Sequence, residues 1–379
     1  MQASADRGLH VALNAHLLSG QDSYRSAGVH QYILHLLHHL GNVEDDVRLT
    51  ALLGAEALKP DTDLDLLRSN RDTSKPAARV LWEQLAQPNV LRRLEADLVH
   101  GPVFVGPLAA PCPVVTTIHD LSFIRFPHLF RPANRLYLTV MTRLSARRAR
   151  HLIAVSEHAA SESVALLGVP RDKITVVYHG VDADFRPLPA DQVAAFRERQ
   201  GLPERFILFV GTLEPRKNLI HLIEAFDRVY KGESRLVLAG GKGWLYDDLF
   251  AKIEALDLKD AVLLPGYVPN EDLPLWYNAA TAFAYPSFYE GFGMPVTEAQ
   301  ACGTPVVTSN RSSLPEAAGE AALLVDPHDV DAIAAGLRRV LSDASLREQL
   351  REQGLSRAQT FRWADTARET VQVYRQAVA

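Results

Sequence analysis

Short runs of Val, Ile and Leu recur along almost the whole chain, and longer amphipathic stretches separate them. Many of these runs are continuous rather than alternating, which is typical of strands that are covered on both faces. A strand–helix–strand order of this kind implies parallel sheets with right-handed crossovers. We expect strands at residues 9–15, 47–54, 97–101, 113–120, 151–156, 173–180, 205–211, 235–241, 261–268, 282–287, 304–310 and 322–327.

These strands form two sets, and residues 182–204 lie between them. That segment begins with an acidic turn and carries three prolines, so we interpret 184–204 as a linker. A chain of 379 residues is long enough for two domains. The sequence therefore predicts an α/β protein with doubly wound parallel-sheet domains at 1–183 and 205–360, followed by a terminal helix at 361–379. A cleft is expected between the domains, because ligands in such sheets lie outside the carboxyl ends of the strands.

The composition is that of a globular protein, with 47% hydrophobic and 22% charged residues. The net charge of −5 gives no overall electrostatic case for nucleic acid. Two cysteines, Cys112 and Cys302, are too few for a disulfide framework, which favours the cytosol. The first residues lack the pattern of a signal peptide, and no apolar run approaches the roughly 18 residues that span a bilayer. Any membrane contact is therefore expected to be peripheral.

The stretch LFVGTLEPRKNL, residues 208–219, predicts a strand that ends at Gly211 and a helix that starts near Asn218. Arg216 and Lys217 therefore come just before a helix amino terminus, which carries free N–H groups and about half a positive charge. Two cations are unfavourable there unless an anion binds. Each charged hydrogen bond to a phosphate is worth roughly 1.5–3 kcal/mol. The position favours a phosphate site, and two solvated surface cations are the alternative.

Two further strand ends carry weaker signals. The motif AGGKGW places Gly240, Gly241 and Gly243 where the backbone can approach a ligand, although a plain turn explains them equally well. The motif TIHD places His119 at the carboxyl end of a strand in the first half. With an ordinary pKa of about 6.5, this histidine could exchange a hydrogen bond with a ligand or simply bond to the local backbone.

Metal binding has simple alternatives at each candidate. His35, His38 and His39 lie at helical neighbour spacing after the Gly28 loop, but no carboxylate ligand is near, so a polar helix face is favoured. Asp-x-Asp pairs can chelate a divalent metal on a nucleotide diphosphate. An acidic turn or a helix start explains both pairs here, so no metal site is predicted. The pairs are Asp61 with Asp63 and Asp182 with Asp184.

The stretch RLSARRARH concentrates four arginines. They could meet an anionic membrane surface or an acidic acceptor, and a solvated helix face is the alternative. The four residues are Arg143, Arg147, Arg148 and Arg150.

The stretch YPSFYEGFGMPVTEAQACGTPVV, residues 285–307, sets Glu290 and Glu298 on either side of a turn that contains Gly-Phe-Gly. A strand delivers Ser287 to the sheet edge, and Pro295 opens the next helix, so Glu298 is expected in its first turn. A capping box from Ser287 to Glu290 and a dipole complement by Glu298 are the structural alternatives. The glycines favour a ligand, because they expose backbone N–H groups. Two carboxylates would accept hydrogen bonds from a hydroxyl-rich ligand such as a sugar.

Together these stretches resemble the retaining glycosyltransferases of family 4, which have the two-domain GT-B fold. The match is densest over 205–326. Its main feature is the spacing of seven residues between Glu290 and Glu298 within EGFGMPVTEAQACGTPVV. GTLEPRKNL, LVLAGGKGW, PGYV and YHGVD also follow the family's order and spacing. The resemblance covers nearly the whole chain. It implies a nucleotide-sugar donor that is bound mainly by the second domain, and a terminal helix that crosses back to the first.

The resemblance implies roles position by position. It places Glu298 on the ribose hydroxyls, Glu290 near the donor sugar, and Lys217 on the diphosphate with Arg216 as a helper. Many members carry an arginine where this chain has Thr212, which leaves open whether Arg216 replaces it. The implied catalytic residues are His119, Arg216, Lys217 and Glu290. The further implied donor contacts are Gly28, Gly211, Thr212, Gly240, Tyr267, Val268, Gly291, Phe292, Gly293, Met294 and Glu298.

The resemblance also implies transfer of a hexose with retention at the anomeric carbon, without a metal or other cofactor. GTLEPRKNL and YPSFYEGFGMP look most like bacterial mannosyltransferases of surface-polysaccharide assembly. GDP-mannose is therefore the expected donor, and a saccharide or lipid-linked saccharide is the expected acceptor. A UDP-sugar transferase of the same fold, a nucleotide-sugar epimerase and a non-catalytic nucleotide-sugar binder are the alternatives.

Overall fold

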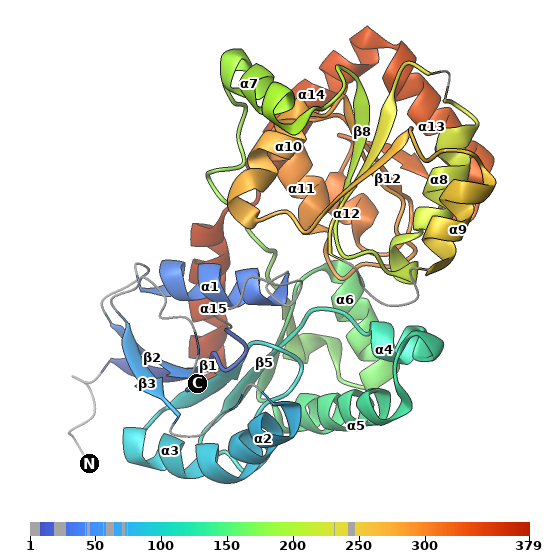
Figure 1. Cartoon of the computed structure of the whole chain (residues 1–379). Coiled ribbons are helices and arrows are strands. Elements are labelled where there is room, and N and C mark those ends of the chain that lie inside the picture. The colour runs from blue at the N-terminus through green and yellow to red at the C-terminus, as the bar shows by residue number, and fades with distance from the viewer. Residues whose placement is uncertain are drawn as a thin grey trace. The chain divides into compact units, whose positions relative to one another are not determined.

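The computed structural model describes residues 8–18, 28–41, 43, 46–55, 57, 64–69, 73, 75–230, 232–241 and 247–379. The chain divides into two compact units, which we call unit 1 (Met1–Gly180 with Trp363–Ala379) and unit 2 (Val181–Arg362). Each unit is built on one parallel sheet with helices on both faces (Figure 1). Within the described ranges, no helix is both long enough and apolar enough to pass through a bilayer.

Within the described part of the chain, the sheet of unit 1 has seven parallel strands in the order β3-β2-β1-β4-β5-β6-β7. The central strands β4 and β5 are buried along their whole length, as their continuous apolar sequences predict. The strands are β1 (Leu9–Asn14), β2 (Val47–Leu53), β3 (Asp65–Arg68), β4 (Leu98–Gly101), β5 (Val114–Ile118), β6 (His151–Ala154) and β7 (Ile174–Val176).

The helices of unit 1 form two layers, with α1 and α15 over one face of the sheet and α3 and α5 over the other (Figure 1). The α-helices are α1 (Val29–Leu40), α2 (Pro76–Leu81), α3 (Gln87–Leu94), α4 (Ser122–Arg125), α5 (Pro132–Arg148), α6 (Glu157–Glu162) and α15 (Trp363–Val378). Two π-helical turns extend them, η2 (Trp82–Ala86) and η4 (Ser163–Leu167), and two 3₁₀ turns are η3 (Pro127–Leu129) and η5 (Arg171–Lys173).

The terminal helix α15 is an integral part of unit 1. Its Trp363 ring stacks on His35 of α1, with ring centroids 4.8 Å apart. Its Tyr374 is fully buried, and the phenol oxygen lies 2.7 Å from Nδ1 of His100 on β4. The histidines of α1 were expected on a polar helix face, and His35 instead packs against this tryptophan.

The sheet of unit 2 has six parallel strands among the described residues, in the order β10-β9-β8-β11-β12-β13. Its central strand β8 has the sequence FILFV and is buried throughout. The strands are β8 (Phe206–Val210), β9 (Arg235–Ala239), β10 (Val262–Gly266), β11 (Ala282–Tyr285), β12 (Val306–Ser309) and β13 (Leu323–Val325).

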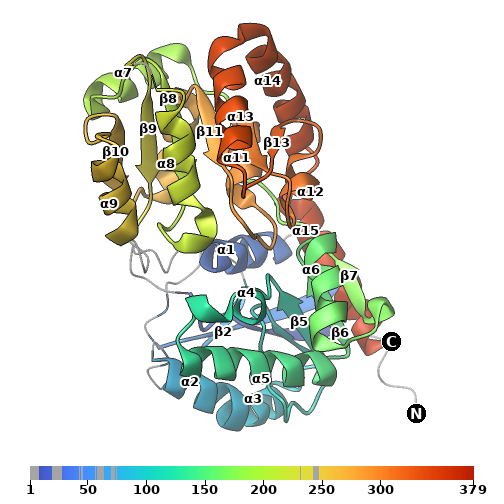
Figure 2. The ribbon, with the colours of Figure 1, turned by 90° about the vertical axis from the view of Figure 1, so that its right-hand side faces the viewer.

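Helices α8, α9 and α13 cover one face of this sheet, and α10, α11 and α14 cover the other (Figure 1 and Figure 2). The α-helices are α7 (Ala190–Gln200), α8 (Leu219–Asp227), α9 (Asp247–Ala255), α10 (Leu273–Ala279), α11 (Met294–Ala301), α12 (Leu314–Ala318), α13 (Val330–Ser342) and α14 (Ala344–Ala358). Two 3₁₀ turns are η6 (Pro215–Lys217) and η7 (Asn270–Asp272).

The segment 184–204 differs from the linker that its composition predicts. It contains helix α7, whose Phe196 is buried and packs edge-on against Trp276 of α10, with ring centroids 5.3 Å apart. The chain divides after Gly180 rather than at 183, and again after Arg362 rather than at 360. The acidic turn, Pro187 and Pro189 precede α7, and Pro203 follows it. The helix between them was missed because an amphipathic helix with one large apolar anchor has too weak a periodicity to stand out.

Candidate active site

The connection from β8 to α8 is short and tightly held. It contains the 3₁₀ turn η6, and Asn218 follows in the left-handed region with a φ of 60°. The Asn218 side chain donates to the carbonyl oxygens of Pro286 at 3.0 Å and Pro327 at 2.7 Å. These bonds tie the connection to the segments that follow β11 and β13. Helix α8 begins directly after Asn218, as the sequence predicts.

The connection from β11 to α11 carries Glu290 and is fixed by two serines from the next connection. The Glu290 N–H donates to Ser312 Oγ at 3.0 Å. The fully buried Ser313 hydroxyl lies 3.0 Å from the Glu290 carbonyl oxygen and 2.8 Å from that of Phe292. Gly293 then turns the chain into α11 with a φ of 112°, a conformation that favours glycine.

Ser313→Ala is expected to lower the free energy of unfolding by about 1–2 kcal/mol, because it leaves two buried carbonyl oxygens without their donor. Ser342→Ala is the matched control, since Ser342 also donates to a carbonyl oxygen, that of Arg338 at 2.8 Å, but is exposed. Thermal unfolding of both variants measures the difference. Equal small losses in the two variants would mean that the Ser313 bonds do not hold this connection.

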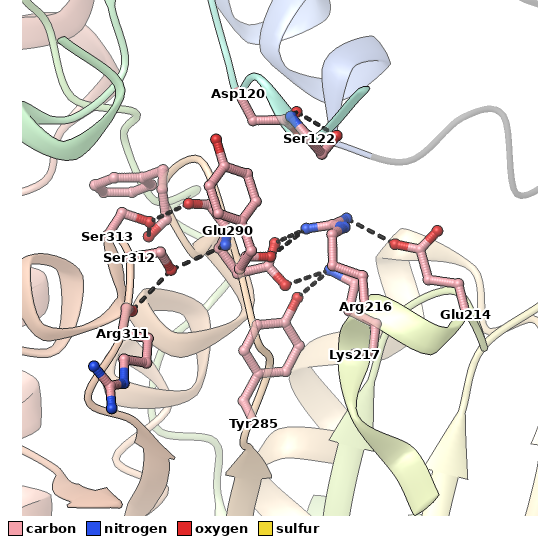
Figure 3. A network of polar contacts seen from close by, with 12 residues as sticks. Asp120, Ser122, Glu214, Arg216, Lys217, Tyr285, Glu290, Arg311, Ser312 and Ser313 are labelled. Carbon is pink, nitrogen blue, oxygen red and sulfur yellow. Dashed lines mark hydrogen bonds and ion pairs between the residues drawn. The ribbon is translucent and has the colours of Figure 1, made fainter. Parts of the chain in front are cut away.

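Arg216, Lys217 and Glu290 converge at the carboxyl edge of the unit 2 sheet (Figure 3). Lys217 Nζ lies 2.7 Å from Glu290 Oε1 and donates to Tyr285 Oη at 2.6 Å. Arg216 Nη1 lies 2.8 Å from Glu290 Oε2, and its Nη2 lies 2.7 Å from Glu214 Oε1. The four charged side chains are only 6–17% exposed. They form a charge-balanced group, which we call the lysine–glutamate cluster (Glu214, Arg216, Lys217 and Glu290).

Burial and charge act in opposite directions on this cluster. Burial alone would raise the pKa of Glu290, but the adjacent Arg216 and Lys217 charges lower it to about 2. Burial, helped by Arg216, lowers the pKa of Lys217, while Glu290 acts to raise it. Burial and the Glu290 charge raise the pKa of Tyr285 well above its ordinary value, so its hydroxyl keeps its proton. Glu290 is therefore ionised at neutral pH and anchors both cations.

The cluster corrects one expectation from the sequence. Arg216 and Lys217 were expected either to be solvated or to require a bound anion, and the structure pairs both with the protein's own carboxylates. The capping-box alternative for Glu290 is wrong, because the next described helix begins only at Met294. Sequence reasoning missed Glu214 as a member. Its place two residues before Arg216, inside GTLEPRKNL, is the one signal that points to it.

Glu298 lies deeper in its helix than expected. Helix α11 begins at Met294, so Glu298 stands in the second turn, and the dipole complement of a first-turn carboxylate does not explain it. Its carboxylate accepts a hydrogen bond from Tyr277 Oη at 2.9 Å, and the side chain is buried. Burial raises the pKa of Glu298 to about 7, with the Tyr277 bond opposing and the Asp182 charge adding to the rise. Glu298 is therefore a buried carboxyl group that titrates near neutrality.

Two of the glycines expected to contact a donor, Gly211 and Gly240, lie against each other. A Cβ on Gly240 would lie 1.8 Å from the Gly211 carbonyl oxygen, so glycine at 240 is required by the protein's own backbone. Thr212, the next residue after Gly211, is partly exposed. Gly243 of the same motif lies outside the described residues. A donor contact at Gly211, Thr212 or Gly240 stays a prediction.

The remaining expected donor positions of unit 2 range from exposed to fully buried. Tyr267 follows β10 and is 40% exposed, whereas Val268 packs against the apolar core of unit 2. Phe292 is 3% exposed, and its ring packs edge-on against Phe361 with centroids 5.3 Å apart. The apolar contact expected from Phe292 is therefore made to the protein itself. The other two positions, Gly291 and Met294, are partly exposed.

His119 and Gly28 belong to unit 1 and are described within it. His119 follows β5, and its Nε2 donates to the Pro102 carbonyl oxygen at 2.8 Å. Burial lowers the pKa of His119, so the ring is neutral and its Nδ1 is left as an acceptor. The local-backbone alternative thus accounts for one ring nitrogen. Gly28 leads into α1 with a φ of 20°, and a Cβ there would meet nothing within 4 Å.

Among the residues that the structure describes, no three His, Cys, Asp or Glu side chains gather as a metal ligand set. Asp182 accepts a hydrogen bond from the Asp184 N–H at 2.9 Å, which is the short acidic turn proposed as the simpler explanation. The other pair, Asp61 and Asp63, lies outside the described residues.

Two family models match the chain. The model of glycosyl transferases group 1 matches residues 193–357, and the model of glycosyltransferase family 4 matches residues 26–185. The first range falls within unit 2, and the second lies almost entirely in unit 1. The two halves of the chain therefore match the two halves of one kind of protein.

One known protein and two solved structures are similar to most of the chain. The O-antigen chain mannosyltransferase B of Escherichia coli is 38% identical over 291 residues, which cover 75% of this chain and 76% of that protein. Sucrose-phosphate synthase of Thermosynechococcus elongatus superposes with a TM-score of 0.78 at 22% identity, over 97% of this chain and 98% of the other. HepE of Anabaena, solved in complex with UDP and glucose, superposes with a TM-score of 0.77 at 18% identity, over 97% and 100%. At these identities the two structures establish the fold alone, which is GT-B.

Proposed function

The chain belongs to the family 4 glycosyltransferases, and from this membership we propose that it transfers mannose from GDP-mannose to a saccharide or lipid-linked saccharide acceptor with retention at the anomeric carbon. Such an enzyme would act in the assembly of a surface polysaccharide. Two free, buried cysteines, Cys112 and Cys302, fit a cytoplasmic protein. No metal or other cofactor is assigned a role in this proposal.

The lysine–glutamate cluster carries this proposal. Lys217 and Arg216 are the cations that would hold the donor diphosphate, and Glu290 pairs with both of them. Because the cluster is charge-balanced, the diphosphate would bind through short-range charged hydrogen bonds rather than through a net positive field. Preorganised cations of this kind stabilise negative charge that develops on a leaving group.

The chemistry would consist of one exchange on one face of the sugar. The bond from the anomeric carbon to the diphosphate breaks, an acceptor hydroxyl attacks the same face, and the departing phosphate takes the hydroxyl proton. Arg216 and Lys217 would stabilise the departing charge. Glu290 would face the donor sugar, and Glu298 would accept hydrogen bonds from the ribose hydroxyls. His119, whose Nδ1 is left as an acceptor, would bind a hydroxyl of the donor sugar.

The choice of mannose rests on one comparison. The 38% identity to an O-antigen chain mannosyltransferase extends over three quarters of both chains. The second candidate is a UDP-sugar donor, which the complex of HepE with UDP and glucose favours. That structure shares the fold with this chain at only 18% identity, so GDP-mannose ranks first.

Thermal unfolding with nucleotide diphosphates and their sugars separates these candidates. GDP and GDP-mannose are expected to raise the unfolding temperature selectively, because a ligand at about 100 times its dissociation constant adds roughly 2.7 kcal/mol to the stability of the folded state. A chelator is expected to leave this rise unchanged. ADP is the control ligand. A rise that is selective for UDP would mean that the donor is a UDP-sugar rather than GDP-mannose. A rise that the chelator removes would contradict the metal-independent mechanism. No rise with any nucleotide would contradict the whole assignment.

Incubation with the donor, with and without a panel of saccharide acceptors, separates transfer from the other two functions. A transferase releases GDP and lengthens one acceptor. An epimerase would change the nucleotide sugar without any acceptor, and a silent binder would change neither. Lys217→Met is the matched control in this assay, because it removes one cation of the cluster and keeps a side chain of similar length.

A further inference from the structure

Helix α5 of unit 1 exposes apolar side chains and buries small ones. Leu136, Val140 and Leu144 recur at four-residue spacing on one face and are 65%, 44% and 40% exposed. The residues that this helix buries fully are Thr142, Ser145 and Ala146. A surface helix of a globular protein usually shows the reverse, with its apolar stripe toward the core. An apolar stripe that faces solvent marks an interaction surface.

Two more exposed leucines lie on the segment beside α5. Leu81 at the end of α2 and Leu85 in η2 are 59% and 68% exposed. The two helical segments flank the same loop, because Gln84 of η2 donates to the Gly106 carbonyl oxygen at 3.3 Å and the Gly106 N–H donates to Ser145 Oγ of α5 at 3.2 Å. Figure 1 and Figure 2 both show α2 beside α5. We call these five exposed side chains the α5 face (Leu81, Leu85, Leu136, Val140 and Leu144).

The chain around α5 is strongly basic. Residues 121–156 contain seven arginines and no Asp, Glu or Lys, although the whole chain has a net charge of −5. Two of these arginines are engaged within unit 1, because Arg125 pairs with Glu162 and Arg148 donates to the carbonyl oxygens of Leu108, Ala110 and Cys112. The remaining five are exposed, and they are Arg131, Arg135, Arg143, Arg147 and Arg150. The basic patch expected from the sequence therefore loses Arg148 and gains two arginines at the other end of α5.

We propose that the α5 face docks on the surface of an anionic lipid bilayer. The five apolar side chains would enter the boundary between headgroups and acyl chains, and the exposed arginines would pair with lipid phosphates. An amphipathic helix that lies in the interface joins these two features, an apolar face and flanking basic side chains. Each basic side chain near an anionic leaflet adds an attraction that salt screens. This inference is independent of the donor and of the chemistry proposed above.

Charge favours a bilayer over a second copy of the chain. A symmetric dimer through the α5 face would bring the same arginines of both copies together, and like charges at an interface oppose association. An anionic lipid surface instead offers a phosphate to every arginine, at any rotation of the helix in the plane. A lipid surface also accepts isolated leucines without a shaped pocket.

Co-sedimentation of the full chain with vesicles tests this docking. The chain is expected to bind vesicles that mix phosphatidylcholine with phosphatidylglycerol, to bind pure phosphatidylcholine weakly, and to dissociate at high salt. Arg143→Glu with Arg147→Glu is expected to weaken the binding by about 25-fold or more, since each lost basic contact corresponds to about fivefold. Leu136→Ser with Val140→Ser and Leu144→Ser is expected to weaken it as well, without changing the net charge.

The control variant Arg338→Glu with Arg339→Glu makes the same change in net charge on exposed residues of α13 in unit 2, and is expected to bind vesicles like the wild type. Thermal unfolding checks that every variant is folded. The increase in unfolding temperature with the nucleotide to which wild type responds checks that each variant keeps its donor site. No binding to anionic vesicles, or equal loss in the control, would overturn the proposal. A dimer that light scattering detects and the leucine variant abolishes would assign the face to a second copy instead.

Discussion

Glu290→Gln is expected to lower the free energy of unfolding by about 3 kcal/mol and to abolish most transferase activity. Glutamine keeps the shape of the side chain and removes its charge. Lys217 and Arg216, which lie 2.7 and 2.8 Å from the carboxylate, would then stay buried with only Glu214 to balance them. A buried cation that loses its partner costs far more than an exposed one, because little water reaches it.

Urea denaturation of wild type and Glu290→Gln measures this loss. Glu224→Gln is the matched control, since Glu224 pairs with Lys252 at 2.6 Å but both side chains are about one-third exposed, so its loss is expected to stay below about 1 kcal/mol. The double variant Glu290→Gln with Lys217→Met should lose less unfolding free energy than the two single variants lose together, because either change alone already breaks the pair. Additive losses would mean that Lys217 and Glu290 do not interact.

The Glu290 effect has a defined pH dependence. The folded-state pKa of about 2 lies below the ordinary value of 4.5, so the unfolded chain binds the proton more tightly. The stabilisation by Glu290 is therefore complete above about pH 4.5 and is lost as the pH falls toward 2. The difference between wild type and Glu290→Gln should shrink over this window. A constant difference would indicate that shape rather than charge is responsible.

Glu298→Gln is expected to act in the opposite direction and to raise the free energy of unfolding by about 2–3 kcal/mol at pH 8, while it weakens donor binding. The folded-state pKa of about 7 lies above the ordinary value of 4.5, so wild type takes up a proton on folding between these values. Its stability therefore falls as the pH rises from 4.5 to 7. Glutamine has no charge to bury. Its amide oxygen can still accept the hydrogen bond that the Tyr277 hydroxyl donates to Glu298 at 2.9 Å.

Denaturation at several pH values measures the Glu298 effect. The gain should be absent below about pH 4.5, grow through pH 7 and then level off. Glu352→Gln, an exposed position on α14, is the control and is expected to change nothing. The rise in unfolding temperature with GDP-mannose should be smaller in Glu298→Gln than in wild type. A variant that is less stable at pH 8, or that keeps the full nucleotide response, would contradict this account.

The strands were predictable because burial on both faces leaves a plain sequence pattern. All twelve expected strands are present, each shortened at one or both ends, and some of the residues outside the strands, such as Ala15 and Ser287, are still buried. Strand β3 was missed. It has only four residues, DLLR, and it lies at the edge of its sheet with no fully buried side chain. An edge strand that is partly exposed lacks the apolar run by which the others are found.

The sequence identified the candidate site residues within each strand–helix connection but did not show which of them contact one another. Arg216, Lys217 and Glu290 stand at the ends of their strands, which the sequence indicates. Their pairing joins residues about 74 positions apart through the neighbouring strands β8 and β11, and no spacing in the sequence specifies that contact. Tyr285 was missed as a partner of Lys217 for the same reason, since it resembles any apolar strand residue.

The packing of α15 against α1 and β4 has a consequence for the growing chain. Unit 2 is one continuous stretch, Val181–Arg362, so all of its residues are made before the helix that completes unit 1. Unit 1 has to wait for Trp363–Ala379, which is made after the whole of unit 2, before Trp363 can cover His35 and Tyr374 can contact His100. Of the two units, the one whose synthesis starts earlier is therefore the one that is completed later. A stop codon just before Trp363 would leave every residue of unit 2 in place and would damage unit 1 instead.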